Sequence, residues 1–232
     1  MKVLSLLEDF ISFFYPNTCY ACGNSLFKHE RILCTHCLHD LPKTNYHLHP
    51  GNPLDQVFWG RVKIEQATAL YYFSKGGKVQ HLIHQLKYRG KKEIGVYLGR
   101  LLGNELKDHP SFHEISTVVP VPLHPRKQRK RGYNQSEQFA IGLAEAMGIR
   151  MDAKSFVRTV ATETQTKKSR FARWENVKEI FAVSDPANLE GRHILLVDDV
   201  VTTGATIESC ANTLLALPGV RVSIASIACA HK

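Results

Sequence analysis

Two adjacent carboxylates stand between an apolar run and a turn rich in Thr and Gly, in the segment ILLVDDVVTTGATI at residues 194–207. The apolar residues 194–197 predict a buried strand, with Asp198 and Asp199 at its C-terminal end. In an open α/β sheet, ligands bind where strands end and helices begin. The segment therefore places acid groups beside a turn that opens a helix, an arrangement that suits a phosphorylated sugar.

The turn has the residues of a phosphate cradle. Gly204 permits a tight turn, and the backbone N–H groups of that turn can converge on one anion. The positive end of the following helix faces the same point. Hydroxyl groups add donors, so the predicted cradle comprises Thr202, Thr203, Gly204, Ala205 and Thr206. A helix after the turn is indicated by apolar residues of helical period: Ile207, Cys210, Ala211, Leu214 and Leu215.

The two acids must contact a part of the ligand other than its phosphate. Because carboxylates repel a phosphate, we expect Asp198 and Asp199 to face vicinal ribose hydroxyls, with Mg²⁺ bound through oxygens of the substrate. The alternative is a strand that carries solvated acids at its end. The length and order of the run favour the ligand site.

Four cysteines form a second pattern. Cys19 and Cys22 are separated by two residues, as are Cys34 and Cys37, and eleven residues lie between the pairs. Each pair can form a tight knuckle, and the four thiolates complete a closed tetrahedron around a structural Zn²⁺. Disulfide bonds are the alternative, but we expect a cytoplasmic location for this chain, which disfavours them. We therefore expect a compact zinc module.

Other side chains of metal-binding type are expected to have no role at this site. His29 and His36 lie near the cysteines, but four thiolates already satisfy the metal, so both histidines are expected to be solvated. Cys210 and Cys229 lie on an apolar helix face and in an apolar final strand. Buried, inert thiols are expected at both positions.

A basic run follows a strand exit rich in Pro at residues 118–135, which read VVPVPLHPRKQRKRGYNQ. We expect a loop there, with five cations in six positions: Arg126, Lys127, Arg129, Lys130 and Arg131. These side chains could contact the phosphate backbone of single-stranded DNA or simply face solvent. Tyr133 beside them could stack a base. A second basic cluster, KYRGKK at residues 87–92, has no predicted orientation.

The elements that must hold these groups alternate along the chain. Helical stripes of apolar residues are predicted at 79–86 and 94–102, and a further helix at 136–147. Strands are predicted at 67–73, 117–121, 194–197 and 222–230. Strands separated by helices imply an α/β fold with a mainly parallel, doubly wound sheet.

Composition agrees with one main domain and a small appendage. At 232 residues and 44% hydrophobic content, the chain can bury one substantial core. Its net charge of +9 favours polyanionic partners. We expect an N-terminal helix and zinc module at 1–40, a linker at 41–66 and the main domain at 67–232. Residues 3–14 predict an amphipathic helix that docks on the protein, with peripheral membrane contact as the alternative and no stable membrane span.

The run at residues 194–207 resembles the signature of type I phosphoribosyltransferases, which bind 5-phosphoribosyl-1-pyrophosphate (PRPP). The resemblance spans about residues 67–232 and implies that Asp198 and Asp199 bind ribose and Mg²⁺, while the cradle holds the 5′-phosphate. With the cysteine module, the chain resembles the ComF (GntX) family of competence and DNA-utilisation proteins. In amidophosphoribosyltransferases a similar strand exit leads into the loop that holds pyrophosphate, which adds pyrophosphate as a ligand of the basic residues.

The polar stretch at residues 158–181 lies where type I enzymes carry a mobile loop that closes over the substrate. The ComF family shows a similar pattern of an Arg, a Thr-Gln pair and a later Arg and Asn. The matching residues are Arg158, Thr164, Gln165, Arg173 and Asn176. An ordinary polar loop is the alternative.

Two departures from relatives bear on the reaction. Purine-salvage relatives carry an acid where this chain has Thr202 and a Lys where it has Ala205. We therefore assign no catalytic residue and expect one of two functions. The first is a cytoplasmic PRPP-binding protein that assists DNA uptake or use, with a competence DNA helicase as the partner that the resemblance implies. The second is an active phosphoribosyltransferase, in which an unidentified nitrogen acceptor displaces pyrophosphate.

Overall fold

The computed structural model describes residues 17–159 and 181–230. Its main sheet has five strands in the order β1-β7-β6-β2-β3, and every neighbouring pair is parallel. A separate antiparallel pair joins β4 to β5. The mainly parallel α/β fold predicted from the sequence is thus confirmed. The strands are β1 (Ala67–Phe73), β2 (Thr117–Pro120), β3 (Arg150–Met151), β4 (Phe156–Arg158), β5 (Phe181–Val183), β6 (His193–Val201) and β7 (Arg221–Ala230).

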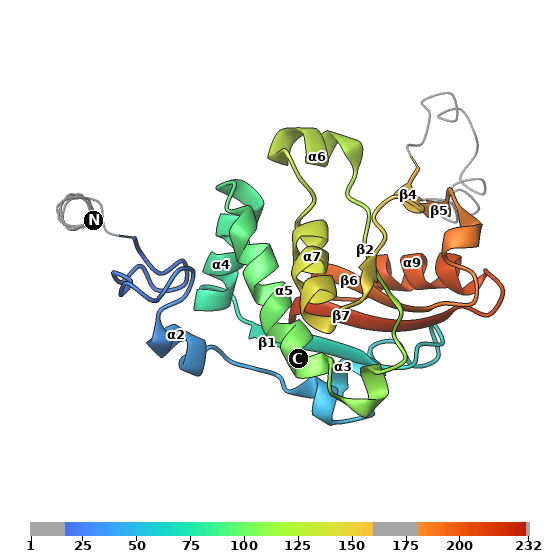
Figure 1. Ribbon diagram of the computed structural model, residues 1–232, viewed down its shortest axis with the longest axis horizontal. Coiled ribbons are helices and arrows are strands. Elements are labelled where there is room, and N and C mark those ends of the chain that lie inside the picture. Colours follow the sequence, from blue (N-terminus) through green and yellow to red (C-terminus); the bar gives the residue numbers. More distant parts are fainter. Residues whose placement is uncertain (1–16, 160–180, 231–232) are drawn as a thin grey trace.

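Helices cover both faces of the main sheet (Figure 1). The α-helices are α2 (Thr35–Asp40), α3 (Pro53–Gln56), α4 (Lys78–Tyr88), α5 (Lys92–Leu106), α6 (Pro125–Arg131), α7 (Gln135–Met147) and α9 (Ala205–Leu215). The 3-10 turns are η1 (Tyr46–Leu48), η2 (Pro110–Phe112) and η4 (Pro186–Asn188). Helices α4, α5 and α7 lie on one face, and α3 and α9 lie on the other.

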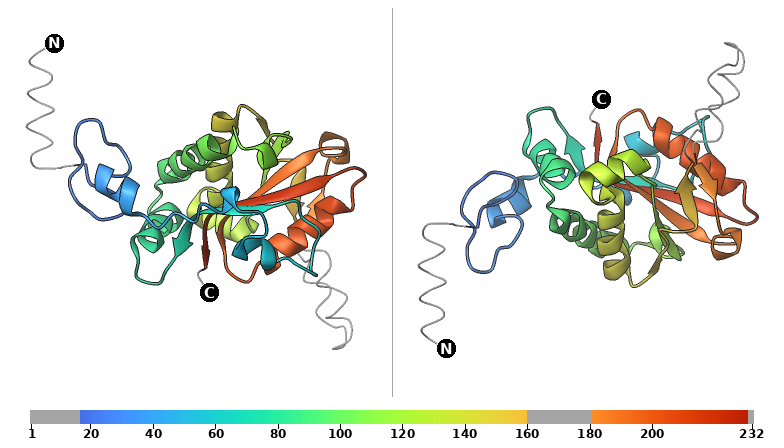
Figure 2. Two further views of the ribbon diagram at one scale, coloured as in Figure 1. Left: turned by 90° about the horizontal axis from the view of Figure 1, so that it is seen from below. Right: turned by 90° about the horizontal axis from the view of Figure 1, so that it is seen from above.

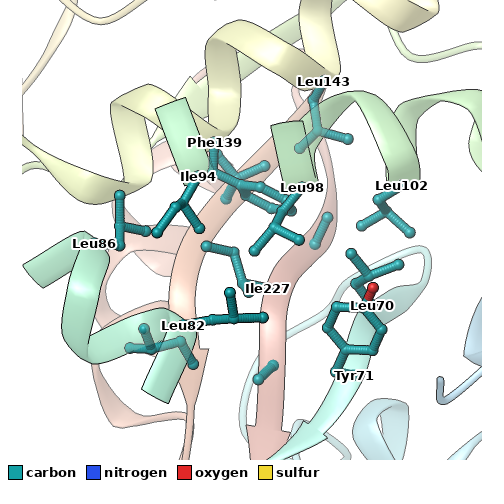
Figure 3. Packing of buried hydrophobic residues seen from close by; sticks show 14 of the residues in the cluster. Leu70, Tyr71, Leu82, Leu86, Ile94, Leu98, Leu102, Phe139, Leu143 and Ile227 are labelled. Carbon is teal, nitrogen blue, oxygen red and sulfur yellow. The ribbon is translucent and has the colours of Figure 1, made fainter. Parts of the chain in front are cut away.

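Alternation along β6 divides its side chains between two cores. Leu195 and Val197 belong to the core under α4, α5 and α7, whereas Ile194 and Leu196 belong to the core under α9. Figure 3 shows the first core, where leucines of the three helices pack against Ile227 of β7. A strand buried on both faces has an unbroken apolar run, which is why the sequence predicted a buried strand here.

Strand β6 is longer than residues 194–197, the range predicted from its apolar run. It continues to Val201, because Val200 and Val201 pair with Ala228 and Cys229 of the long neighbouring strand β7. Both acids lie within the strand, near its C-terminal end.

The basic run at residues 126–131 forms helix α6, so the prediction of a loop is wrong. The side chain of His124 caps the helix by accepting the Arg126 N–H at 3.1 Å, and Pro125 occupies the first turn. Gly132 ends the helix with a φ of 81°. These cap signals favour a short helix despite the repulsion among its cations.

Residues 41–66, predicted as a linker, pack onto the main sheet. The Tyr72 N–H donates to the Pro42 carbonyl at 2.8 Å, and the Asp55 carboxylate accepts the Ala67 N–H at 2.5 Å. Phe58 is fully buried. Residues 17–40 lie at one end of the molecule beside α4 (Figure 2), and Tyr20 bonds to Glu93 of α5. The domain boundaries at 40 and 66 stay a prediction, and the predicted helix at 3–14 lies outside the described residues.

Candidate functional site

The carboxylate of Asp198 is held at the start of helix α7. Its Oδ1 accepts the Ser136 hydroxyl at 2.8 Å and the Asp199 N–H at 2.8 Å. Asn134 caps α7 by accepting the Ser136 N–H, which places that hydroxyl next to β6. Burial and the charge of Asp199 raise the pKa of Asp198 to about 7, although Ser136 and Lys87 act in the opposite direction. The acid pair thus carries one readily titrated carboxyl near neutral pH.

The second acid is paired with a cation from helix α4. Lys87 Nζ lies 2.8 Å from Asp199 Oδ1, and both side chains are mostly covered. The orientation of this basic cluster was not predicted from the sequence, and neither Lys87 nor Ser136 was predicted as a site residue. Neither residue is near β6 in the sequence, so only the fold brings them to the acids.

The predicted phosphate cradle forms a small polar hollow of about 40 Å³. All five cradle residues line it together with Asp198, so the structure brings this acid and the turn to one place, whereas Asp199 does not line the hollow. No side chain of the described residues caps α9 at Gly204, and the first N–H groups of the helix therefore remain available to a ligand. An uncapped helix N-terminus favours an anion.

Gly204 is required in the cradle by both conformation and space. Its φ is 76°, and a Cβ at this position would lie 2.9 Å from ring atoms of Phe58 and from Val57. Arg61 supports the turn from the same segment by donating to the Thr203 carbonyl at 2.9 Å and pairing with Glu208 of α9. Residues of the predicted linker therefore pack against the cradle turn, a contact that was not predicted from the sequence.

A second hollow of about 180 Å³ borders the cradle at Thr202. Its walls include Tyr46, Tyr72 and Val57. The two tyrosine rings meet edge to face, with centroids 5.6 Å apart. An apolar, aromatic hollow next to a phosphate cradle can hold a ring or another flat apolar group.

The predicted basic residues divide between two sides of α6. Lys127, Lys130 and Arg131 line a cleft of about 380 Å³ against the end of α4, where Lys87 and Tyr88 lie. Arg126 and Arg129 are exposed and do not line the cleft. The structure thus brings the two basic clusters of the sequence together.

Tyr133, predicted as a base-stacking residue, is buried, and this prediction is wrong. Its hydroxyl donates to the Leu86 carbonyl, and Lys92 lies over its ring at 5.0 Å. Arg158 ends β4 and lies over the Phe181 ring at 5.3 Å. The other residues of the predicted mobile loop, Thr164, Gln165, Arg173 and Asn176, lie outside the described residues.

The four N-terminal cysteines gather at one point, with their Sγ atoms all within 4.8 Å of one another. Cys22 Sγ and Cys34 Sγ lie 3.7 Å apart, and all four thiols are free of disulfide bonds. A tetrahedral zinc with Zn–S bonds of about 2.3 Å has sulfur atoms about 3.8 Å apart. The cluster is therefore positioned to bind a metal ion.

Local hydrogen bonds favour a thiolate in this cluster. Burial alone would raise the pKa of Cys19, but backbone N–H groups of Cys34, Cys22 and Ala21 outweigh it and lower the pKa to about 7. The nearby histidines lie elsewhere: His36 pairs with Asp40 at 2.9 Å and is exposed, as expected. The thiols of Cys210 and Cys229 are buried, also as expected.

Comparisons with known proteins agree with this geometry. The family model described as the phosphoribosyl transferase domain matches residues 112–232. The DNA utilization protein YhgH of Escherichia coli is 34% identical over 201 residues, which are 85% of this chain and 83% of that protein. Competence protein F of Haemophilus influenzae is 30% identical over 186 residues, covering 78% of this chain and 77% of that protein.

Two more distant proteins show similarity to the chain. Competence protein ComFC of Bacillus subtilis is 27% identical over 205 residues, covering 82% of this chain and 80% of that protein. Among solved structures, glutamine PRPP amidotransferase of Bacillus subtilis has 22% identity and a TM-score of 0.42, covering 61% of this chain and 30% of that one.

The chain belongs to the ComF family of proteins with a phosphoribosyltransferase domain. The resemblance predicted from the acid pair, the cradle and the cysteines is thereby confirmed. Within the part of the chain that the structure describes, no helix combines the length and apolar character needed to cross a bilayer.

Proposed function

We propose that the hollow at the β6–α9 junction binds PRPP or a related nucleotide. The observation that carries this proposal is the uncapped N-terminus of α9 within the same hollow as Asp198. The cradle would hold the 5′-phosphate, and Asp198 and Asp199 would face the ribose hydroxyls. These separate roles follow from charge, because the helix N-terminus attracts the phosphate, whereas the acids repel it.

Magnesium is part of this proposal. Two adjacent carboxylates are hard oxygen ligands of the kind that Mg²⁺ prefers, and Asp199 already holds one cation, the Lys87 ammonium, at 2.8 Å. The acids would contact Mg²⁺ through oxygens of the bound sugar. When bound, the metal would neutralise charge on the ligand, while the chain itself orients ribose through the acids and the phosphate through the cradle.

A role in DNA uptake or use is the second part of the proposal. Relatives that span most of the chain are named for DNA utilization and competence. The net charge of +9 and the basic cleft beside the acid pair support a nucleic-acid partner. A competence DNA helicase stays the proposed protein partner on family resemblance.

Zinc is the proposed metal of the cysteine cluster. A tetrahedron of four thiolates is closed, so the metal would be structural and leave no position for a substrate. Four reduced thiols in one site also support a location in a reducing compartment, which for this chain would be the cytoplasm. The module packs against α5, so the metal would stabilise the end of the molecule near the basic cleft.

One observation favours catalysis as a second candidate function. The pKa of Asp198 is raised to about 7, near the value at which a carboxyl group exchanges protons efficiently at neutral pH. An active transferase would release pyrophosphate from PRPP in the presence of a nitrogen acceptor. A screen of bases and nucleotides for acceptor-dependent release tests this, and no release with any acceptor would leave the binding function alone.

Thermal unfolding tests the PRPP proposal. Ligand at a hundredfold excess over its Kd stabilises the folded state by about 2.7 kcal/mol, so PRPP with Mg²⁺ should raise the Tm by several degrees. Ribose 5-phosphate should raise it less, since it lacks the pyrophosphate. An unchanged Tm with both ligands at millimolar concentration would contradict the proposal.

A further inference from the structure

The cleft between the end of α4 and helix α6 is separate from the phosphate cradle. It measures about 380 Å³ and is lined by Lys87, Tyr88, Gly90, Lys127, Lys130 and Arg131. Its two walls are far apart in the sequence, and Figure 1 shows α6 projecting from the main body near the top of α4. Through Lys87 the cleft reaches the acid pair, because Lys87 Nζ also contacts Asp199.

Charge in this cleft is one-sided. Four of its lining residues are cations, and no carboxylate of the described residues lines it. Among the described residues, Lys87 is the cleft cation that forms an ion pair, and its partner is Asp199. Lys127 and Lys130 are exposed. Such a concentration of unneutralised charge attracts a ligand that carries several phosphates.

An exposed aromatic ring lies at the edge of the cleft. Tyr88 is 61% exposed, which is unusual for a large side chain with an apolar face. The Arg131 guanidinium lies 5.3 Å from its ring centroid, and the His84 ring lies 4.9 Å away on the same helix. The contacts orient the ring while leaving most of it open. Aromatic side chains within a basic groove are typical of proteins that bind single-stranded nucleic acid by base stacking.

We propose that this cleft binds single-stranded nucleic acid. Phosphates of the backbone would lie against Lys127, Lys130 and Arg131, while a base stacks on Tyr88. Free pyrophosphate also carries phosphate groups, but it has no base that could stack on the exposed ring of Tyr88. The proposal rests on the DNA role given above and locates it on particular residues.

Helix α6 itself offers a matched test. Lys127 and Lys130 lie on the face that lines the cleft, whereas Arg126 and Arg129 lie on the same helix and do not line it. Each double substitution to Gln removes two positive charges from the same seven residues. A simple effect of net charge would therefore weaken binding equally in both variants.

Fluorescence anisotropy with a labelled oligodeoxythymidine of about 12 nucleotides measures the affinity, at constant ionic strength. We expect Lys127→Gln with Lys130→Gln to weaken binding about tenfold and to make it less dependent on salt. Arg126→Gln with Arg129→Gln should change it less than about twofold. Tyr88→Leu should weaken binding about fivefold, and Tyr88→Phe, which keeps the ring, should restore it. Circular dichroism checks that each variant is folded.

Three outcomes would overturn the location. Equal losses in the two double variants would show a general charge effect. Full binding by Tyr88→Leu, together with displacement of the oligonucleotide by stoichiometric inorganic pyrophosphate, would assign the cleft to pyrophosphate. Full binding by the Lys127 and Lys130 variant would place the DNA elsewhere on the protein. Only an absence of binding by the wild-type chain would contradict the DNA role itself, and PRPP binding is measured separately.

Discussion

Lys87 Nζ lies 2.8 Å from Asp199 Oδ1, so a cation of helix α4 directly contacts the acid pair of the candidate site. The same lysine lines the basic cleft against α6. One side chain is therefore shared between the proposed site for a sugar phosphate and the proposed site for a larger polyanion. A ligand that binds Asp199 in place of Lys87 would break this ion pair and leave the charge of Lys87 free to face the cleft.

This shared lysine predicts a gain in nucleic-acid affinity when its acid partner is removed. Asp199→Asn eliminates the ion pair, so Lys87 can turn to the cleft, and we expect single-stranded DNA to bind about threefold more tightly. Lys87→Gln should weaken binding by a similar factor. Anisotropy with the same oligonucleotide measures both. Asp108→Asn removes an exposed acid from a distant position and serves as the control; an equal gain there would refute the coupling.

The raised pKa of Asp198 predicts a characteristic pH dependence of stability. The pKa rises from 3.8 to about 7 in the folded chain, so the native state favours the protonated carboxyl. Its contribution to stability is fully present below pH 3.8 and is lost as the pH rises through about 7. Urea unfolding of metal-free protein between these pH values should show this loss in wild type and not in Asp198→Asn. Identical pH profiles would disprove the assignment.

Gly204→Ala is expected to damage the cradle more than a comparable glycine substitution elsewhere. A positive φ costs about 1 kcal/mol for a side chain, and the contact with Phe58 and Val57 adds a clash of about 1–2 kcal/mol. Gly148 has a φ of 68° and open space around it, so Gly148→Ala should show the conformational cost alone. Chemical unfolding compares the two variants. Equal losses would mean that the space below Gly204 is not restricted.

The cysteine cluster predicts one equivalent of zinc in freshly purified, reduced protein. Cys37→Ala should lose the metal and lower the Tm, because three thiolates cannot complete the tetrahedron and the free energy of metal binding contributes to folding. Cys210→Ala also removes a buried thiol but lies outside the cluster, so it should keep the full equivalent. Elemental analysis decides between them. A stoichiometric metal content in Cys37→Ala, or none in wild type, would contradict the assignment.

Groups that are adjacent in the chain could be predicted from the sequence. The acids, the cradle and the cysteines were predicted because each group is built from local spacing. In the structure Asp198 lies with the cradle, and the four cysteines lie at one point. The strands and helices that enclose the two cores were predicted from apolar runs and helical stripes, although the composition was taken to indicate a single core. These features depend on residues within a few turns of one another.

Groups brought together only by long-range packing were missed. Ser136 lies 62 residues from Asp198, and Arg61 lies 142 residues from Thr203. Nothing local distinguishes them from ordinary polar residues. The length of β6 depended in the same way on its partner β7. The helix at α6, in contrast, had local signals in Pro125 and Gly132, which the density of cations obscured.

The central claim is that Asp198, Asp199 and the α9 cradle bind PRPP. Isothermal titration calorimetry of wild-type protein with PRPP and Mg²⁺ tests it most directly. We predict one site per chain, with binding lost in the Asp198→Asn, Asp199→Asn double variant and kept in the Asp108→Asn, Glu190→Gln double variant, which removes two exposed acids outside the site. An absence of heat with wild type, or equal binding by all three proteins, would contradict the claim.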